Sequence, residues 1–318
     1  MTDNPVKKDT APAAVPGSPS PQAGPEAIRA IPVRHYGRWV SGVVVVALLV
    51  GLVYAFSQGN IHWEAIPQTI FDPSVVEGAG ATLLISVLAM VMGVVLGVIL
   101  AVMRMSKNPV VNGVSWLYIW FFRGTPVYVQ LLMWFNLALI FEYLNLGPFY
   151  KDEMTDVMTP FMCALLGLGL NEAAYMAEIC RAGLLSVDEG QTEAAHALGM
   201  SHSRTLRRIV IPQAMRVIVP PTGNEFINML KTSSLAYAVT YTELLRATSS
   251  IGSRSYAVME LLFVASIWYL VLTSVFSVFQ YYLERHFAKG SSRTLPPTVF
   301  QKLKANLFGS PRTGGVSA

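Results

Sequence analysis

Seven polar side chains interrupt segments that are otherwise apolar enough to lie inside a membrane. They are Asn171, Glu172, Glu178, Arg181, Asn224, Glu225 and Lys231. An ionisable group is costly inside a bilayer, so such groups pair with one another or line a path for a polar solute. These residues are therefore the candidates for chemistry in this chain, with a purely structural role as the alternative for each.

Two pairs of these residues lie in one apolar segment, and their spacing gives them different predicted roles. Glu178 and Arg181 are three residues apart, so on a helix they share a face and are predicted to form a structural ion pair. Asn171 and Glu172 lie deeper in the same segment. Glu172 is predicted to face a polar cavity and to contact a solute there.

A second predicted wall of this cavity comes from the least apolar segment of the chain. Asn224 and Lys231 are seven residues apart, which is two helical turns, so they share one face. Pro220 and Pro221 precede them and lack the backbone N–H groups that a helix needs, so we expect a broken hydrogen-bond ladder with exposed carbonyls. The combination predicts a polar surface within the membrane.

The composition places the chain among integral membrane proteins. Of its 318 residues, 53% are hydrophobic and only 13% are charged, whereas soluble domains carry about 25% charged residues. The two cysteines, Cys163 and Cys180, lie in apolar stretches and are predicted to be small buried hydrophobes. No cysteine or histidine spacing, including that of His196 and His202, predicts a metal or redox site.

The predicted fold is all-α, with about six transmembrane helices. The predicted spans are 39–57, 78–103, 110–141, 158–183, 213–241 and 261–283. The third is predicted to be broken where Arg123, Gly124 and Pro126 interrupt it.

The spans define the expected domain organisation. Residues 78–285 form the core, and 39–57 adds one helix before it. Residues 1–38 are rich in proline, alanine, serine and glycine and are predicted to be a disordered tail, and 286–318 form a second tail.

The distribution of lysine and arginine predicts the orientation of the spans. One side collects most of the basic residues, including those of both tails, whereas the other side holds only Lys151, Arg246 and Arg254. Because basic loops remain in the cytoplasm, both termini are predicted to be cytoplasmic. An even number of spans agrees with this arrangement.

A polar loop on the cytoplasmic side, residues 193–212, is predicted to form a helix, a turn and a second helix. Residues 193–198 favour a helix. Gly199 permits the turn, and Ser201 is placed to cap a helix over 203–210.

The turn of this loop presents apolar side chains. Leu198 and Met200 are predicted to be exposed knobs that fit a groove on a partner protein. The alternative from composition alone is an amphipathic loop that lies on anionic lipid.

A spaced pattern in this loop resembles that of a known family. Glu193-Ala-Ala is followed by Gly199 and then, after nine intervening residues, by Ile209-Val-Ile-Pro212. ABC importer permeases carry E-A-A, three residues, G, nine residues and I-x-L-P, so this chain departs only at Ile211. In that family the loop holds the coupling helix, which docks on a cytoplasmic ATPase subunit. The resemblance implies this role for Glu193, Ala194, Ala195, Leu198, Gly199, Met200, Ser201 and Pro212.

Further motifs narrow the resemblance to the permeases of polar amino-acid importers. Arg123-Gly-Thr-Pro126 followed by Gln130-Leu131 is similar to their R-G-T-P-x-x-x-Q-L segment. The stretch 174–183 is similar to their A-Y-x-x-E-x-x-R-x-G segment, and it contains Glu178 and Arg181. The similarity covers 78–285 and implies structural or pathway roles for Arg123, Gly124, Pro126, Glu178 and Arg181.

The resemblance implies the permease subunit of an ATP-driven importer for a polar or charged amino acid, in a prokaryotic inner (cytoplasmic) membrane. It implies two cytoplasmic ATPase subunits, an extracellular or periplasmic binding protein, and pairing with a second copy or a paralogous permease. The chain contains no Gly-Lys-Ser/Thr sequence, so we expect ATP and Mg²⁺ on the partner ATPase and no enzymatic activity here. Nothing points to nucleic acid.

The main alternative is a secondary transporter driven by an ion gradient. It predicts internal inverted repeats, and none is evident in the sequence. It also leaves the polar loop 193–212 without a role. Which amino acid is carried, and whether two identical permeases pair, stays open.

Overall fold

The computed structural model describes residues 36–145 and 147–287, which form two units. Almost all of both predicted tails lies outside these residues. The first unit, residues 1–59, contains one described helix, α1 (Tyr36–Ser57). From Val40 to Ser57 it carries no charged residue, and its described side chains are exposed. The helix predicted at 39–57 is therefore confirmed and begins three residues earlier.

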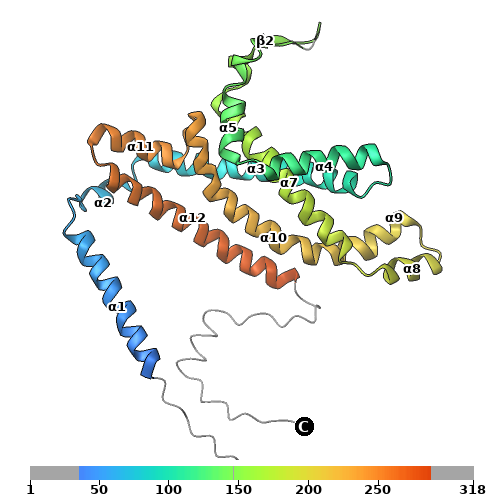
Figure 1. Cartoon of the computed structure of the whole chain (residues 1–318), viewed down its shortest axis with the longest axis horizontal. Coiled ribbons are helices and arrows are strands. Elements are labelled where there is room, and N and C mark those ends of the chain that lie inside the picture. Colours follow the sequence, from blue (N-terminus) through green and yellow to red (C-terminus); the bar gives the residue numbers. More distant parts are fainter. Residues whose placement is uncertain (1–35, 146, 288–318) are drawn as a thin grey trace, which may run out of the picture. The chain divides into compact units, whose positions relative to one another are not determined.

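The second unit is built around two long helices, α3 (Pro73–Arg104) and α7 (Pro160–Leu185). Each starts at a proline, which needs no N–H partner in the first turn, and at an N-cap side chain. The Asp72 carboxylate accepts the Ser74 N–H, and the Thr159 hydroxyl accepts the Met162 N–H. The two helices lie side by side (Figure 1).

Two glycines of α3 allow this close contact. A Cβ atom at Gly93 would lie 2.6 Å from Cγ of Glu172, and one at Gly97 would lie 2.5 Å from Cβ of Met176. These distances are too short for any larger residue. The small-residue spacing of Gly93 and Gly97 therefore serves packing against α7 within the chain.

The third predicted span is broken as expected. Helix α4 (Pro109–Gly124) ends at Gly124, Thr125 and Pro126 are extended, and α5 (Val127–Phe135) begins directly after them. The prediction that this span continues to residue 141 is wrong, because α5 ends at Phe135 and a short 3₁₀ turn, η1 (Leu137–Leu139), follows.

A small hairpin corrects the all-α prediction. Strands β1 (Tyr143–Asn145) and β2 (Lys151–Glu153) pair antiparallel, and α6 (Met154–Val157) follows them. The turn begins where the Asn145 side chain accepts the N–H of Gly147, which has a positive φ of 71°. The hairpin lies beyond α5, away from α3 and α7 (Figure 1).

The last part of the unit contains α10 (Ile211–Thr232), η3 (Ser233–Val239), α11 (Leu244–Ser255) and α12 (Val258–Phe287). A short α2 (Ala65–Thr69) precedes α3. The span predicted at 213–241 changes to a 3₁₀ helix at Ser233. Helix α10 continues through Pro220 and Pro221, although neither proline has a backbone N–H for the helical hydrogen-bond ladder. The expected gap in the ladder therefore does not end the helix.

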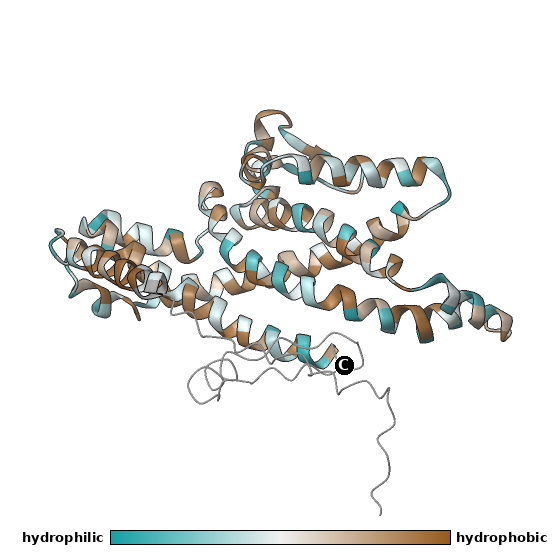
Figure 2. Cartoon of the chain, turned by 60° about the horizontal axis from the view of Figure 1, so that its bottom comes forward, coloured by the Kyte–Doolittle hydropathy of each residue, from teal (hydrophilic) through white to brown (hydrophobic). Residues whose placement is uncertain are grey.

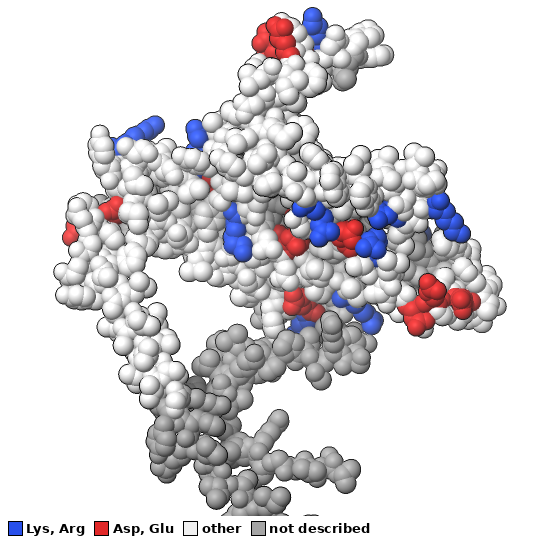
Figure 3. All heavy atoms as spheres, viewed as in Figure 1, with Lys and Arg blue, Asp and Glu red and all other residues white. Residues whose placement is uncertain are grey.

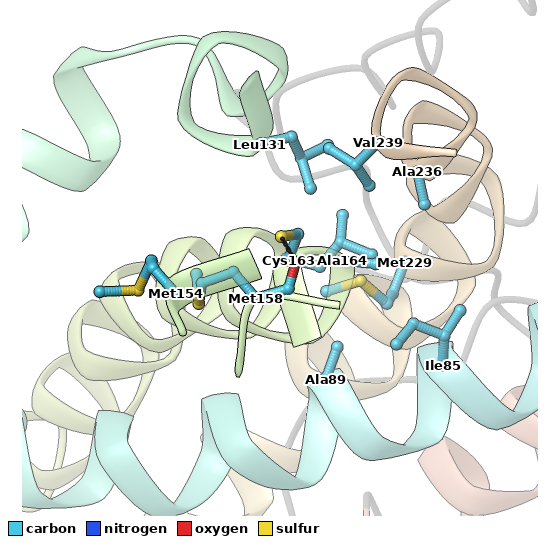
Figure 4. Packing of buried hydrophobic residues seen from close by; sticks show 11 residues of the cluster. Ile85, Ala89, Leu131, Met154, Met158, Cys163, Ala164, Met229, Ala236 and Val239 are labelled. Carbon is cyan, nitrogen blue, oxygen red and sulfur yellow. Dashed lines mark hydrogen bonds between the residues drawn. The ribbon is translucent and has the colours of Figure 1, made fainter. Parts of the chain in front are cut away.

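The largest buried cluster joins α3, α5, α6, α7, α10 and η3 (Figure 4). Ile85 and Ala89 come from α3, Leu131 from α5 and Met229 from α10. Cys163 is part of the cluster and, like Cys180, is a buried free thiol, as predicted. This core fixes α5 and α10 against α7, whose next turns carry the predicted site residues.

Three helices of the described residues are long and apolar enough to cross a membrane: Val40–Ser57, Pro73–Arg104 and Val258–Phe287. The chain is therefore a mostly helical, multi-pass membrane protein. Figure 2 shows hydrophilic residues among the hydrophobic ones along several other helices. Helices α7 and α10 carry the polar residues singled out from the sequence, which lowers their hydropathy.

Candidate functional site

A polar cavity of about 660 Å³ lies between α5, α7, α10 and η3. It contains three of the four residues predicted to line a pathway, namely Asn171, Glu172 and Lys231. Asn224 is exposed on α10 and is not among the lining residues. We call this space the acidic cavity. Its lining is Val127, Leu168, Asn171, Glu172, Tyr175, Glu225, Asn228, Met229, Lys231, Thr232, Ser234 and Leu235.

Glu172 is the most unusual residue of the acidic cavity. Its side chain is only 5% exposed, and its Oε1 atom has no hydrogen-bond partner among the described residues. Gly93 on α3 has no side chain, and this leaves room for the Cβ and Cγ atoms of Glu172. A buried carboxyl group without a partner is costly, so this position is suited to bind a proton or a cationic group.

The other charges of the acidic cavity come from α10. Glu225 is half-buried, and Lys231 is exposed. The amides of Asn171 and Asn228 supply neutral donors and acceptors in the same lining. The cavity therefore offers both signs of charge to a small zwitterionic solute.

Asn171 connects the acidic cavity to the broken helix. Its Nδ2 donates to the Phe122 carbonyl oxygen at 2.8 Å and to Oε1 of Gln130 at 3.2 Å. Gln130 is buried, and its Nε2 donates across the break to the carbonyl oxygens of Phe122 and Thr125 and to the Thr125 hydroxyl. These bonds satisfy carbonyls that the break at Thr125 and Pro126 leaves without helical partners.

Arg123, Gly124 and Pro126 lie at this break. Gly124 ends α4, and Pro126 is the N-cap residue of α5. The Arg123 guanidinium carbon lies 5.2 Å from the centroid of the Tyr175 ring of α7, a distance typical of a cation–π contact. This contact connects the break to α7.

The predicted pair of Glu178 and Arg181 is present. Nη2 of Arg181 lies 2.7 Å from Oε2 of Glu178, and Nε lies 3.2 Å from the same oxygen. The Glu178 side chain is 26% exposed, and the Arg181 side chain is 36% exposed. This pair neutralises Glu178 next to the cavity residues of α7.

The loop predicted to dock on a partner begins with α8 (Glu189–Ala197). Leu198 is the C-cap residue, and Gly199, whose φ is +75°, follows it in a Schellman arrangement. The Gly199 N–H donates to the His196 carbonyl oxygen at 2.9 Å, and the Met200 N–H donates to that of Ala195 at 3.0 Å. Glycine fits this left-handed position because it has no Cβ atom.

The turn exposes one of the two predicted apolar knobs. Leu198 is 84% exposed, whereas Met200 is half-buried and Ala195 is buried. Glu193 and Ala194 lie on the exposed side of α8. The loop therefore presents a single large apolar side chain at its tip.

The second helix of the loop begins after Ser201, as predicted, but the serine side chain makes no capping bond. Instead the Ser201 carbonyl oxygen accepts the Thr205 N–H. Helix α9 (His202–Thr205) passes through a wide π turn, η2 (Leu206–Val210), into α10. Pro212 lies in the first turn of α10, where its missing N–H leaves no helical hydrogen bond unmade.

A second polar cluster, which the sequence did not reveal, lies at the start of α11. Glu243 is fully buried and accepts the N–H groups of Leu245 and Arg246 and the hydroxyl groups of Thr82 and Tyr269. Burial raises the pKa of the Glu243 carboxyl, and these hydrogen bonds oppose the rise. The cluster joins α3, α11 and α12.

Several functional candidates were missed or given no role from the sequence. Gln130, Tyr175 and Ser234 were noted only as motif letters, and Asn228 was not noted at all. An isolated amide or hydroxyl in an apolar stretch carries little signal by itself. Its role depends on which other helix it faces, and only the packing of α5 and α10 against α7 decides that.

Comparison with known proteins places this architecture in a family. Residues 93–289 match the family described as binding-protein-dependent transport system inner membrane component. The arginine transport system permease protein ArgU of Corynebacterium glutamicum is 50% identical over 275 residues, which cover 86% of this chain and 87% of that protein. The glutamine transport system permease protein GlnP of Escherichia coli is 34% identical over 226 residues, covering 71% and 97% of the two chains.

Solved structures give the same result. The crystal structure of an amino acid ABC transporter with histidines matches with a TM-score of 0.62 and 34% identity, covering 72% of this chain and 100% of that one. The inward-facing MetNI methionine ABC transporter matches with a TM-score of 0.54 at 18% identity, which supports the fold alone. These matches support the ATP-driven importer and not the ion-driven alternative. The chain belongs to the binding-protein-dependent transport system inner membrane component family, the permease subunits of ABC importers.

Proposed function

We propose that this chain is the permease subunit of an ABC importer for an amino acid with a cationic side chain, and that the acidic cavity is part of its pathway. The observation that carries the proposal is the buried Glu172 carboxyl, which faces the cavity without a hydrogen-bond partner among the described residues. The similarity to a permease named for arginine transport supports the same substrate class.

The charges of the cavity match the two ends of such an amino acid. Glu172 and Glu225 attract a guanidinium or ammonium group, and Lys231 attracts the α-carboxylate. Because the site is partly desolvated, these attractions are stronger than in water. Each charge that the substrate neutralises also removes part of the cost of holding that charge in a membrane.

The loop that contains Gly199 is the proposed coupling element. Its exposed Leu198 offers a compact apolar knob to a groove on an ATPase subunit, and the Schellman turn fixes that knob in position. Two such ATPase subunits bind ATP and Mg²⁺, so this chain does no ATP chemistry itself. Movement of α8 and α9 then passes through the wide turn into α10, which carries Glu225 and Lys231.

The topology proposed for the membrane has six spans with both termini in the cytoplasm. Helices α1, α3, α7, α10 and α12 supply five spans, and α4 with α5 supplies the broken one. This arrangement places the loop 193–212 on the cytoplasmic side of a prokaryotic inner membrane. An extracytoplasmic binding protein delivers the substrate, and a second permease, identical or paralogous, completes the pathway.

Uptake into proteoliposomes tests the proposal. The complex of this chain with its ATPase and binding protein is reconstituted, and ATP-dependent uptake of arginine, lysine, histidine, glutamine and glutamate is compared. We expect arginine or lysine to be preferred, and Glu172→Gln to reduce that uptake about tenfold or more, since about 1.4 kcal/mol of lost attraction is a factor of ten.

The matched control is Glu77→Gln, because Glu77 is an exposed acid on α3 outside the cavity lining. It is expected to transport like the wild type. Preferred uptake of glutamate, or unchanged arginine uptake by Glu172→Gln, would contradict the proposed substrate class.

A further inference from the structure

A second polar cavity adjoins the acidic cavity, and one side chain belongs to both. This second space has a volume of about 480 Å³ and lies between α3, α4 and α7. We call it the arginine cavity. Its lining is Arg104, Trp116, Ile119, Trp120, Arg123, Gly124, Tyr175 and Glu178. Among the described residues, Tyr175 is the one shared by the two linings.

The two cavities differ in the sign of their charge. The acidic cavity holds Glu172 and Glu225, with Lys231 as its one lining cation. The arginine cavity holds Arg104 and Arg123, and its only lining acid among the described residues, Glu178, is already paired with Arg181. A cationic solute that moves from the first cavity to the second therefore passes from attraction to repulsion. Figure 3 shows charged side chains of both signs gathered in a band across this face.

The two arginines of this cavity are held differently. Arg104 donates from Nη1 to the Asn112 side chain, whose Nδ2 donates back to the Arg104 carbonyl oxygen at 2.6 Å, so Arg104 is fixed on the α3–α4 corner. Arg123 is exposed, and its guanidinium carbon lies 5.2 Å from the centroid of the Tyr175 ring. Such a contact at an exposed site is weak enough to open and close during transport.

Arg123 also lies at the break between α4 and α5. It lies one residue before Gly124, where α4 ends and the extended residues Thr125 and Pro126 begin. A small change in backbone direction at this break moves the guanidinium group off the ring. Tyr175, in contrast, is fixed in the middle of the long helix α7.

We propose that Tyr175 is the gate between the acidic cavity and the arginine cavity, and that Arg123 holds it in place through the contact of its guanidinium group with the ring. A cationic substrate crosses only when Arg123 leaves the Tyr175 ring. While Arg123 stays on the ring, the positive charge of its guanidinium group opposes the passage of the substrate. The inference rests on the proposed function, since it requires the acidic cavity to be part of the pathway.

Release of substrate in the absence of ATP tests the gate. Proteoliposomes that contain the reconstituted complex are preloaded with labelled arginine, and ATP-independent efflux is measured beside ATP-driven uptake. We expect Tyr175→Ala to raise efflux about tenfold and to lower the arginine imported per ATP hydrolysed. Tyr175→Phe keeps the ring and is expected to restore most of the arginine retention that Tyr175→Ala loses. Tyr128→Ala is the matched control, because Tyr128 is an exposed tyrosine on α5 that lines neither cavity.

Arg123 variants give a second, independent test that does not alter the packed helix α7. Arg123→Gln is expected to raise efflux several-fold, and Arg123→Lys to restore most of the retention, because it keeps the charge. Unchanged efflux in both Tyr175→Ala and Arg123→Gln overturns the gate, and if Tyr175→Ala does not accumulate, Arg123→Gln decides alone. If the unsubstituted complex does not import arginine, the proposed function and the gate are both overturned. This outcome is distinct from a failure of the gate alone, because it is seen in the wild-type complex without any substitution.

Discussion

Gly199 gives the sharpest test of the coupling loop, because a substitution there changes the backbone conformation of the turn without placing a Cβ atom against any neighbour. The residue has a φ of +75°, and a Cβ atom built on it meets nothing within 4 Å among the described residues. A substitution therefore creates no clash. Its cost is backbone strain, about 1–2 kcal/mol for an ordinary L-residue in the left-handed region. That strain raises the population of other turn conformations by about 5–30-fold.

The perturbation is Gly199→Val, compared with Gly199→Asn, since asparagine tolerates the left-handed region better than other residues. The assay measures both recovery of the ATPase subunit with this chain in mild detergent and uptake per ATP hydrolysed. We expect Gly199→Val to insert in the membrane normally but to lose coupled uptake at least five-fold, and Gly199→Asn to retain most of it. Gly80→Ala is the control, because Gly80 also has open space but lies within the helix α3.

Wild-type uptake and full ATPase recovery with Gly199→Val would refute the reasoning, since the strain would then have no effect on the docked turn. Equal losses in the valine and asparagine variants would show that the added side chain, and not the turn conformation, disturbs the partner surface.

Two further predictions concern the stability of the packed helices. Glu243→Ala removes the cap of α11 and leaves the hydroxyl groups of Thr82 and Tyr269 without their partner. We therefore expect the free energy of unfolding to fall by about 2–4 kcal/mol, measured by thermal unfolding in detergent. A change under about 0.5 kcal/mol would contradict the role of Glu243 as a cap. Gly223→Ala would place a Cβ atom 1.5 Å from Oε1 of Gln280, whose Nε2 donates to the Pro220 carbonyl oxygen at 2.8 Å. We expect it to cost about 1–3 kcal/mol, and a melting temperature equal to that of Gly80→Ala would show that the Gln280 side chain can move away.

The membrane character, the helix break at Arg123–Pro126 and the ion pair of Glu178 with Arg181 could be predicted from the sequence. Each depends on local rules: a low fraction of charged residues, a glycine and a proline in an apolar stretch, and a spacing of three on one helix. The position of the turn at Gly199 was predicted for the same reason, because a helix ending at glycine is determined within a few residues.

Predictions from the sequence failed where packing between distant parts of the chain competes with local conformational preference. Pro220 and Pro221 predict a broken hydrogen-bond ladder with exposed carbonyls, but α10 continues through both and packs against α12, where Gln280 donates to the Pro220 carbonyl oxygen. Met200 was expected to be a second exposed knob, but the Schellman turn folds it back beside Ala195.

The sequence by itself determined which residue types are available for transport and roughly where along the chain they lie. Only the tertiary structure decided which of them meet. It brings Asn171, Glu172 and Lys231 into one cavity and leaves Asn224 outside that lining. Neither result follows from spacing along a single helix, because a cavity wall is set by how α7 and α10 pack, and that packing depends on glycines such as Gly93 on a third helix.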